Sequence, residues 1–448
     1  MRSNLVSVMC AAILLAPARS DAQTPLLAPG AQVAPAISAP YVDQAGGLSL
    51  EDAIALALKQ EPSLRAARSE IVAATARRQQ AALRANPTAT AERRQEPGGT
   101  DSQTSVGMQL PLDLFRRGAR IAVAEREIDV SRLDVADRGQ RLAVDVRARY
   151  GDVLVAVREL AVLDELLSAT RRQLDLVAAR AKEGAVPPLE RDLLDVDVRR
   201  LMADQRLQVG RVDAAFVSLK RTVGLAPDAM LTVRETLEAV VTRETASPMP
   251  VPHAEGAVRR RPDVLAAEAR IAAADARIKQ SASDGRFDVS VYGTYMRMDA
   301  GFPQSGFALG GGLERVRGLF NYVAGGAMVM IPLLNRNQGA VAAAQAERVG
   351  ATAARDAVVL QAQADLAAAR IDDASAREAV AYYRDGAQRL ARQNLDVVSQ
   401  TFALGRGTVF DVLTEHRRYL DIEKSFTDTL RFAFEARTRL QFALGDVR

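Results

Sequence analysis

The chain has 448 residues, enough for two or three domains, and 48% of them are hydrophobic, which suffices for a packed core. Aromatic residues make up only 4%, tryptophan is absent and alanine is abundant, a composition typical of closely packed helices. The net charge of +4 comes from arginines that alternate with aspartates and glutamates. This mixture indicates solvated helix faces and argues against nucleic-acid binding.

The N-terminus has the pattern of a targeting segment. Arg2 is followed by a short apolar run, and small residues precede Gln23. We therefore expect a signal peptide over residues 1–22 and an Ala/Pro-rich extension over residues 23–47. The one cysteine, Cys10, lies inside the apolar run, so the mature chain would have no disulfide, thiol catalyst or cysteine–zinc site. No later segment has the apolar length of a transmembrane helix.

The second half of the chain repeats the first. The segments beginning at Pro62 and Pro262 match at nine of 19 positions with an offset of 200 residues. Further along the offset is 221 residues, and it relates Pro111 to Pro332, Gly118 to Gly339, Gly184 to Gly405, Leu219 to Leu440 and Gly224 to Gly445. One 21-residue insertion therefore belongs to the second copy. We predict repeats over residues 48–225 and 253–448, joined by a non-helical linker over residues 226–252.

Each repeat begins with a helical stretch and continues into short strands. In the first repeat, Ser49 and Asp52 have the spacing of a helix cap, and Pro62 should divide the helix. Non-helical segments follow over residues 86–115 and 284–335. They contain strands of about ten residues: SVGMQL, DVSVYGTYMRM, NYVAGGAMVMI and the weaker TATAERRQ. We assign the insertion to a long turn over residues 299–318.

A very long helix follows the strands in each repeat, over residues 116–182 and 336–403. Apolar side chains between Val146 and Ala181 recur at a mean step of 3.5 residues, the coiled-coil period. Such a helix is about 100 Å long. Turns over residues 183–190 and 404–411 then reverse the chain into returning helices.

Four strands of this length suggest a membrane β-barrel that one chain cannot close. Tilted strands of about ten residues span a bilayer, but lipid does not tolerate open sheet edges. Two chains would supply eight strands, and three would supply twelve and leave a lumen. The alternative is a soluble, elongated coiled-coil scaffold. The signal peptide and the duplicated strand pairs favour the channel.

The repeated motifs resemble the TolC-like outer membrane factors, the outer-membrane channels of tripartite efflux systems. The resemblance rests on EPSLRAARSEI and RPDVLAAEARI, on the strand exits LPLDLFRRGARIAVAE and IPLLNRNQGAVAAAQAE, and on the turns EGAVPPLERDLLD and LGRGTVFDVL. It implies a homotrimer in the outer membrane with a 12-strand barrel and a 12-helix periplasmic tunnel. It also implies a periplasmic adaptor and an inner-membrane transporter, expected to be proton-driven, as partners. The arginine-rich PLDLFRRGARIAVAE is most similar to the heavy-metal cation branch.

The resemblance also implies where function resides. Asp411 matches a family position that lines the narrow periplasmic entrance, and Glu190 is its counterpart in the first repeat. Thr408 is a further entrance candidate. The family often has a basic residue at the position of Gly407 that helps to lock the closed tip, and since it is missing here, the adjacent Arg406 is the candidate substitute. For Asp411 a helix-capping role with Thr408 is an equally serious interpretation.

The two turns are also candidates for docking the adaptor. The residues concerned are Gly184, Ala185 and Val186 in the first turn and Gly405 and Arg406 in the second. The simpler interpretation is that Gly184 and Gly405 are ordinary left-handed helix C-caps.

No motif indicates an enzyme, a cofactor or a metal site. The chain lacks GxxxxGK, GxSxG, HExxH and CxxC patterns. Of the two histidines, His253 and His416, we expect His416 on a solvated helix surface. The methionines of the strands indicate packing against lipid or lumen, in preference to copper ligation.

Three functions remain in competition. The first is an outer-membrane efflux duct for metal cations or small toxic compounds. The second is a similar channel for protein secretion, and the third is a periplasmic coiled-coil adaptor. An adaptor would have one helical hairpin between β domains, whereas this sequence has two repeats with paired strands.

Overall fold

The computed structural model describes residues 38–99, 101–246, 254–307 and 309–445, which belong to one compact unit formed by residues 37–448. Its elements are the 3₁₀-helix Ala39–Tyr41, α1 Leu50–Gln60, α2 Pro62–Ala82, β1 Thr88–Gln95, β2 Ser102–Pro111, α3 Arg116–Lys182, α4 Pro188–Val223, α5 Leu237–Thr245, α6 Ala254–Val258, α7 Pro262–Asp284, β3 Asp288–Phe307, β4 Leu313–Met330, α8 Gln338–Tyr382, a π-helix Tyr383–Ala387, α9 Gln388–Ala403 and α10 Val409–Leu444. The predicted signal peptide, with Cys10, and most of the extension over residues 23–47 lie outside the described residues.

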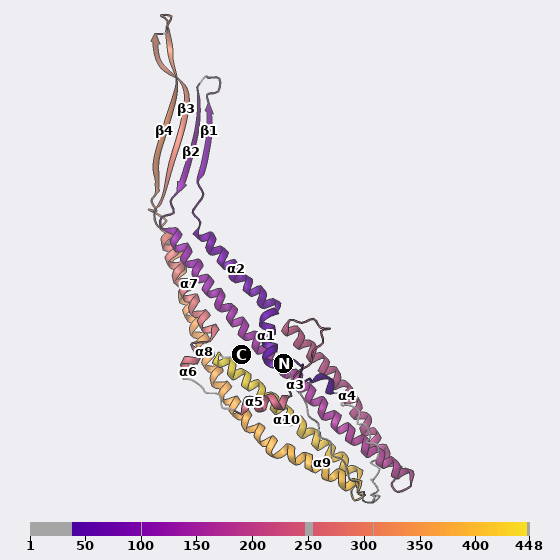
Figure 1. Ribbon diagram of the computed structural model, residues 1–448. Helices are drawn as coiled ribbons and strands as arrows, with labels where there is room; N and C mark the ends of the chain where they lie inside the picture. Colours follow the sequence, from indigo (N-terminus) through magenta and orange to yellow (C-terminus); the bar gives the residue numbers. More distant parts are fainter. Residues whose placement is uncertain (1–37, 100, 247–253, 308, 446–448) are drawn as a thin grey trace, which may run out of the picture. The chain divides into compact units, whose positions relative to one another are not determined.

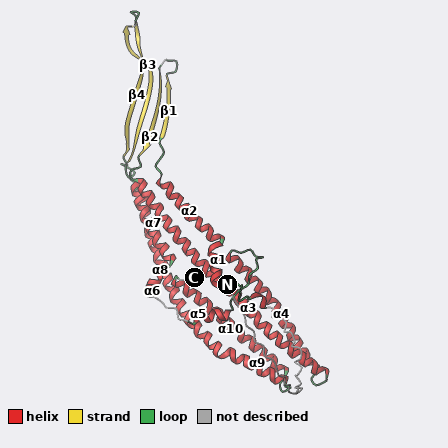
Figure 2. Cartoon of the chain, in the orientation of Figure 1, coloured by secondary structure: helices red, strands yellow, loops and turns green. Residues whose placement is uncertain are grey.

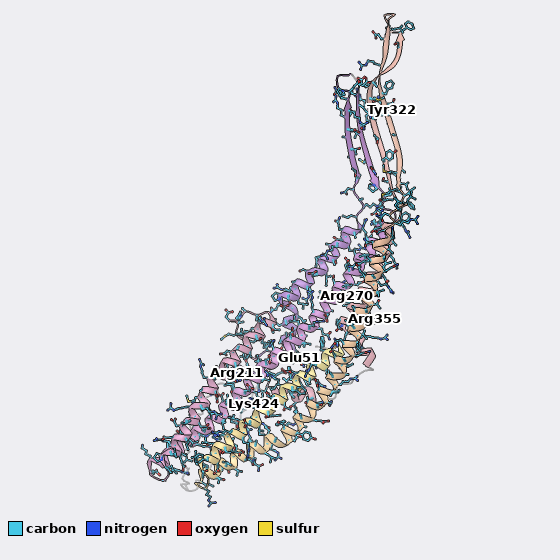
Figure 3. The ribbon with its side chains drawn as sticks, turned by 180° about the vertical axis from the view of Figure 1, so that it is seen from behind. Glu51, Arg211, Arg270, Tyr322, Arg355 and Lys424 are labelled. Atoms are coloured by element: carbon cyan, nitrogen blue, oxygen red, sulfur yellow. The ribbon has the colours of Figure 1, made fainter. Side chains whose placement is uncertain are left out.

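Within this unit the strands form one antiparallel sheet at one end of the long helices (Figures 1 and 2). The strand order is β1-β2-β3-β4, so β1 and β4 are the two edges. Charged side chains such as Arg270, Arg211 and Lys424 lie along the helices, and Tyr322 lies on the sheet (Figure 3). None of the helices in the described ranges is long and apolar enough to cross a membrane.

The long helix α3 has the predicted bounds. Its stripe of apolar side chains is buried at Val146, Tyr150, Val153, Leu160 and Leu167, which confirms the coiled-coil step of 3.5 residues. With 67 residues, α3 extends about 100 Å. Most of its stability must come from this packed stripe, because the helix carries many β-branched residues.

The largest core lies where α1, α3, α4, α5 and α10 meet. Tyr150 is fully buried there, and its hydroxyl donates to the carbonyl of Leu48 at 2.9 Å. Val233 forms parallel bridges with Val42 and Leu48, which ties the chain after α4 to the segment before α1. The core is therefore built from both repeats and from the segment between them.

Several local predictions are confirmed. The Ser49 side chain accepts a hydrogen bond from the amide of Asp52 (3.1 Å), and α2 begins at Pro62 after an extended Glu61. Pro111 is the last residue of β2. Four glycines that the offset of 221 relates in pairs all have left-handed φ angles: Gly184 (+74°), Gly405 (+74°), Gly224 (+85°) and Gly445 (+74°).

The predicted strand lengths are wrong for the second repeat. β3 has 20 residues and β4 has 18, and their pairing continues to Phe307 opposite Leu313. The insertion over residues 299–318 is thus mainly strand rather than a long turn. Glycine, proline and arginine suggested a turn there, but the register with the partner strand satisfies the backbone of this stretch and overrides the local preference.

The interpretation of residues 226–252 as non-helical is also wrong in part. Leu237–Thr245 forms α5, which Thr236 caps by accepting from the amide of Ala239 (3.3 Å). Leu237, Val240 and Val241 are buried against the main core. The segment is too short to show a helical period clearly, and its tertiary packing decides its structure. Residues 247–252 lie outside the described ranges.

The second long helix is not continuous. A π-helix at Tyr383–Ala387 separates α8 from α9, whereas α3 runs without interruption. Tyr383 of this π-helix stacks on Phe426 of α10, with ring centroids 5.9 Å apart. A π-helix accommodates one extra residue, which a count of apolar steps does not reveal.

Candidate functional site

The first helical turn connects α3 to α4 through a left-handed glycine. The amide of Gly184 donates to the carbonyl of Ala181 (3.1 Å), and that of Ala185 donates to the carbonyl of Arg180 (2.9 Å). These bonds satisfy two of the carbonyls that a helix end leaves free. Pro188 then begins α4, at a position where a missing amide costs little.

The second turn, between α9 and α10, has the same geometry. The amides of Gly405 and Arg406 donate to the carbonyls of Phe402 (2.9 Å) and Thr401 (3.0 Å). The expectation of a helix C-cap is therefore confirmed for Gly184 and Gly405. Their part in adaptor docking, together with that of Ala185, Val186 and Arg406, stays a prediction.

Thr408 and Asp411 form the predicted capping box at the start of α10. The hydroxyl of Thr408 accepts from the amide of Asp411 (3.3 Å), and Asp411 Oδ2 accepts from the amide (2.9 Å) and the hydroxyl (2.7 Å) of Thr408. These hydrogen bonds from the Thr408 side chain and amide hold the pKa of the Asp411 carboxyl below its usual value. The residue is nonetheless exposed, so its carboxylate remains open to solvent.

An apolar cluster holds the two turns side by side. Val177 of α3, Leu194 of α4, Phe402 of α9 and Val409 and Val412 of α10 are all buried in it. Partly buried residues add to the cluster, among them Val186 of the first turn. The two candidate acidic residues, Glu190 and Asp411, therefore stand at the same end of the molecule, each in the first turn of its helix.

Arg180 links the turns in a way that the sequence did not indicate. Its guanidinium donates to the carbonyl of Phe402 (3.4 Å) and to that of Ala403, the last residue of α9. A cation at a helix C-terminus interacts favourably with the helix dipole and with the free carbonyls. The residue that the offset of 221 relates to Arg180 is Thr401, so the second repeat cannot return this contact.

Two further polar links join α3 to α9 between the turn and the π-helix. Arg392 pairs with Glu165 at 2.6 Å, and Gln173 Nε2 donates to Ser399 Oγ at 3.0 Å. Tyr419 of α10 lies beside Arg392, and burial raises the pKa of its phenol to about 12. Hollows of about 580 and 320 Å³ flank the Glu165–Arg392 pair.

Arg406, an entrance candidate, faces solvent, whereas His416, which was expected on a solvated surface, does not. Arg406 is exposed in the turn, and Gly407 next to it lies close to the backbone of Phe402. The expectation of a solvated His416 is wrong, because its side chain is buried between α10 and α4 with Nδ1 3.3 Å from Asp197 Oδ2. Within the described part of the chain, no three potential metal ligands come together. His253 lies outside it.

The sheet has two chemically different faces. Because side chains alternate along a strand, the pairing register places Val106, Val291, Tyr295, Val323 and Val329 on one face. The other face carries Gln103, Ser105, Gln109, Ser290 and Thr294, together with Tyr322 and the methionines 296, 298, 328 and 330. One polar contact on this second face joins Gln103 Nε2 to Met296 Sδ at 2.6 Å. Both faces are largely exposed in the single chain.

Solved structures of outer-membrane channels have the same fold. The chain aligns with CusC, described through its folding and transmembrane channel formation, with a TM-score of 0.72 and 16% identity over 89% of this chain and 92% of that one. A membrane protein from Pseudomonas aeruginosa gives a TM-score of 0.71 and 21% identity, covering 88% and 92% of the two chains. The open-state outer membrane channel MtrE of Neisseria gonorrhoeae gives 0.69 and 19% identity, covering 89% of each.

A family model described as outer membrane efflux protein matches residues 53–224. This match covers the first half of the chain and is to the family that the repeated motifs resemble. Curated proteins provide no match to the chain. The matched family model describes efflux proteins rather than enzymes, so the residues to consider are those of a passage and its contacts.

Proposed function

We propose that the chain is the outer-membrane channel subunit of a tripartite efflux system. Three copies form a 12-strand barrel in the outer membrane, and their helices form a tunnel in the periplasm. The tunnel receives substrates through a periplasmic adaptor from an inner-membrane transporter of the proton-driven type, which the resemblance implies, and releases them outside the cell. The match of residues 53–224 to the outer membrane efflux protein family model supports this assignment.

The observation that carries the proposal is the open four-stranded sheet at the end of the helices. β1 and β4 present unpaired edges, which a membrane protein must close. One face of the sheet is apolar from Val329 to Val106, with Thr104, Arg297 and Asn321 beyond, and the other is rich in Gln, Ser and Thr. This alternation matches that of lipid-facing and lumen-facing residues in membrane barrels. Twelve strands from three copies leave a lumen, whereas eight would be filled by side chains.

The two helical turns would form the periplasmic entrance. With three copies, Asp411 would make a ring of carboxylates that attracts cations, and Glu190 would add a second acidic position. The exposed side chains of Leu189, Leu404 and Phe410 (62%, 74% and 64% exposed) give these turns an apolar surface suited to an adaptor. Capping and lining the entrance are compatible roles for Asp411, because its carboxylate is both bonded to Thr408 and exposed.

The cargo we propose is metal cations or small toxic compounds. The arginine-rich strand exit at residues 111–125, similar to the heavy-metal branch, supports the first of these. Deleting the gene should reduce tolerance to zinc, cobalt, copper or drugs. Unchanged tolerance together with the loss of a secreted protein would favour the secretion channel instead.

Planar-bilayer recording tests the channel itself. Purified protein should be extracted only with detergent, elute as a trimer and form pores that prefer cations. Asp411→Ala should lower the cation conductance, whereas Asp228→Ala, an exposed aspartate far along the chain from both turns, should not. Equal conductance and selectivity would leave Asp411 with the capping role alone. Release of the mature protein without detergent would rule out the channel and favour the soluble adaptor.

A further inference from the structure

A hollow of about 710 Å³ lies at the junction between the sheet and the helices. One wall is the loop from Met330 to Asn335, which leaves β4, and the other includes Arg116 and Arg286. The sequence predicts this region only as the exit from a strand. A connection between a strand and a helix does not require the apolar and basic side chains that gather here.

The wall of the hollow is fixed by the backbone. A Cβ on Gly285 would overlap the carbonyl oxygen of Arg336, so only glycine allows the end of α7 to approach the start of α8 this closely. Asn337 adopts a left-handed conformation (φ +61°), and its Nδ2 donates to the carbonyl of Ser281 at 2.8 Å. The loop is thus held in place against α7.

The loop exposes a large apolar surface. Ile331, Leu333 and Leu334 are 65%, 72% and 93% exposed, although nothing in a turn requires three large aliphatic side chains in succession. They follow directly after the last residue of β4, Met330. Such a surface is unfavourable in water and favourable against hydrocarbon.

Positive charge surrounds this apolar surface. Residues 83–87, 111–120, 284–288 and 330–338 contain six arginines and three aspartates, an excess of three positive charges per chain. Arg116 is paired with Asp288 (3.1 Å) and Arg120 with Asp113 (2.7 Å). Arg286 lies 5.5 Å from the ring centre of Phe115, and neither it nor Arg336 has a carboxylate within ion-pair distance in the described ranges.

We propose that this hollow binds the headgroup of an anionic phospholipid. Its phosphate is held by Arg286, which lines the hollow, and by Arg336, which lies in the loop between the lining residues Asn335 and Asn337. Its acyl chains lie against Ile331, Leu333 and Leu334. Arginine recognises phosphate well, and basic residues at a membrane boundary attract anionic lipids. The site rests on the proposed function, because it places the junction at the level where the barrel leaves the lipid.

Native mass spectrometry of the purified trimer in mild detergent tests this site. Phosphatidylglycerol and phosphatidylethanolamine with the same acyl chains are added separately. The trimer should retain the anionic lipid preferentially. Arg286→Gln combined with Arg336→Gln should lower that retention roughly ten-fold, to the level of the zwitterionic lipid, because each arginine near an anionic surface contributes substantially. Arg286→Lys with Arg336→Lys, which keeps the charge, should retain most of the binding.

The matched control removes two exposed arginines elsewhere, Arg171→Gln with Arg417→Gln, and should leave lipid retention unchanged. Equal retention of both lipids, or equal loss in the control, would overturn the site. If inorganic phosphate displaces the bound lipid and the acyl chains do not affect its retention, the hollow is a site for free phosphate instead. If a second copy of the chain covers the loop, neither lipid will bind, and that result would also overturn the proposed lipid site. Pore conductance measured on the same sample separates these outcomes from failure of the channel proposal.

Discussion

Arg180 shows how one side chain makes two repeats unequal. The turns at Gly184 and Gly405 have the same backbone hydrogen bonds, yet only the first repeat sends a cation to the other turn. The position that the family often fills with a basic residue is Gly407 here. Arg180 provides a contact across the turns from a different helix.

Arg180→Ala should loosen the entrance. We expect a loss of about 1 kcal/mol in the free energy of unfolding, because the guanidinium is partly exposed and its bonds to the carbonyls are charge-assisted. Chemical denaturation measures this loss, and single-channel recording should show higher conductance. Arg171→Ala, in the same helix but exposed, is the control. An unchanged conductance with the expected loss of stability would restrict Arg180 to a structural cap.

The capping carboxylate predicts a dependence of stability on pH. The pKa of Asp411 is lowered in the folded chain from 3.8, so its stabilising effect is present above that value and is lost as the pH falls through the lower folded pKa. The difference in melting temperature between the wild type and Asp411→Asn should therefore be constant near neutral pH. It should shrink below about pH 4. A difference that persists in strong acid would contradict the capping role.

At the scale of elements, α3 and α10 pack closely at one glycine. A Cβ on Gly151 would lie 2.6 Å from the ring of Phe434, whereas a Cβ on Gly210 in α4 would meet nothing within 4 Å. Gly151→Ala should lower the free energy of unfolding by about 1–3 kcal/mol through overpacking. Gly210→Ala should be neutral or stabilising by up to about 1 kcal/mol, because alanine favours helices. Denaturant titration of both variants measures the contrast, and equal effects would contradict the close packing.

The π-helix predicts the effect of a deletion. Removing Gly386, which has open space around it, should convert Tyr383–Ala387 to α-helix while α9 keeps its buried face. The deletion variant should therefore fold with an unchanged or higher melting temperature. Removing Gly350 from the regular part of α8 rotates all that follows and should be strongly destabilising. A similar loss in both variants would show that the π-helix does not absorb the change.

Long elements with a strong period could be predicted from the sequence. The bounds of α3, the caps at Ser49 and Thr408 and the left-handed Gly184 and Gly405 all agree with the structure, because each depends on residues close in the chain. The length of β3 and β4 could not be predicted, since pairing with a partner strand decides it. The same holds for α5 and for buried His416, whose environments come from residues far away in sequence. Of the candidate site, the turns were predicted, but the contact of Arg180 was not.

At the scale of the whole molecule, the two faces of the sheet predict opposite responses to charge. Val323 lies on the apolar face, and Ala324 beside it lies on the face with Thr294. Val323→Arg should block insertion, since an arginine facing lipid near the middle of the membrane costs about 2–4 kcal/mol. Ala324→Arg should assemble normally and alter ion selectivity. The amount of trimer in outer-membrane fractions measures both, and normal assembly of Val323→Arg would reverse the assignment of the faces.

The insertion that lengthens β3 and β4 makes the hairpin of the second repeat taller than the hairpin of the first. β2 stops pairing with β3 at Asp299, but β3 and β4 continue together to Phe307 and Leu313 (Figure 1). In a closed assembly, tall hairpins from the second repeat would alternate with short ones from the first. Antibodies and phages would then contact almost only the hairpin of the second repeat. Sequence changes at the tip of this hairpin could therefore alter the surface of the cell without altering the channel.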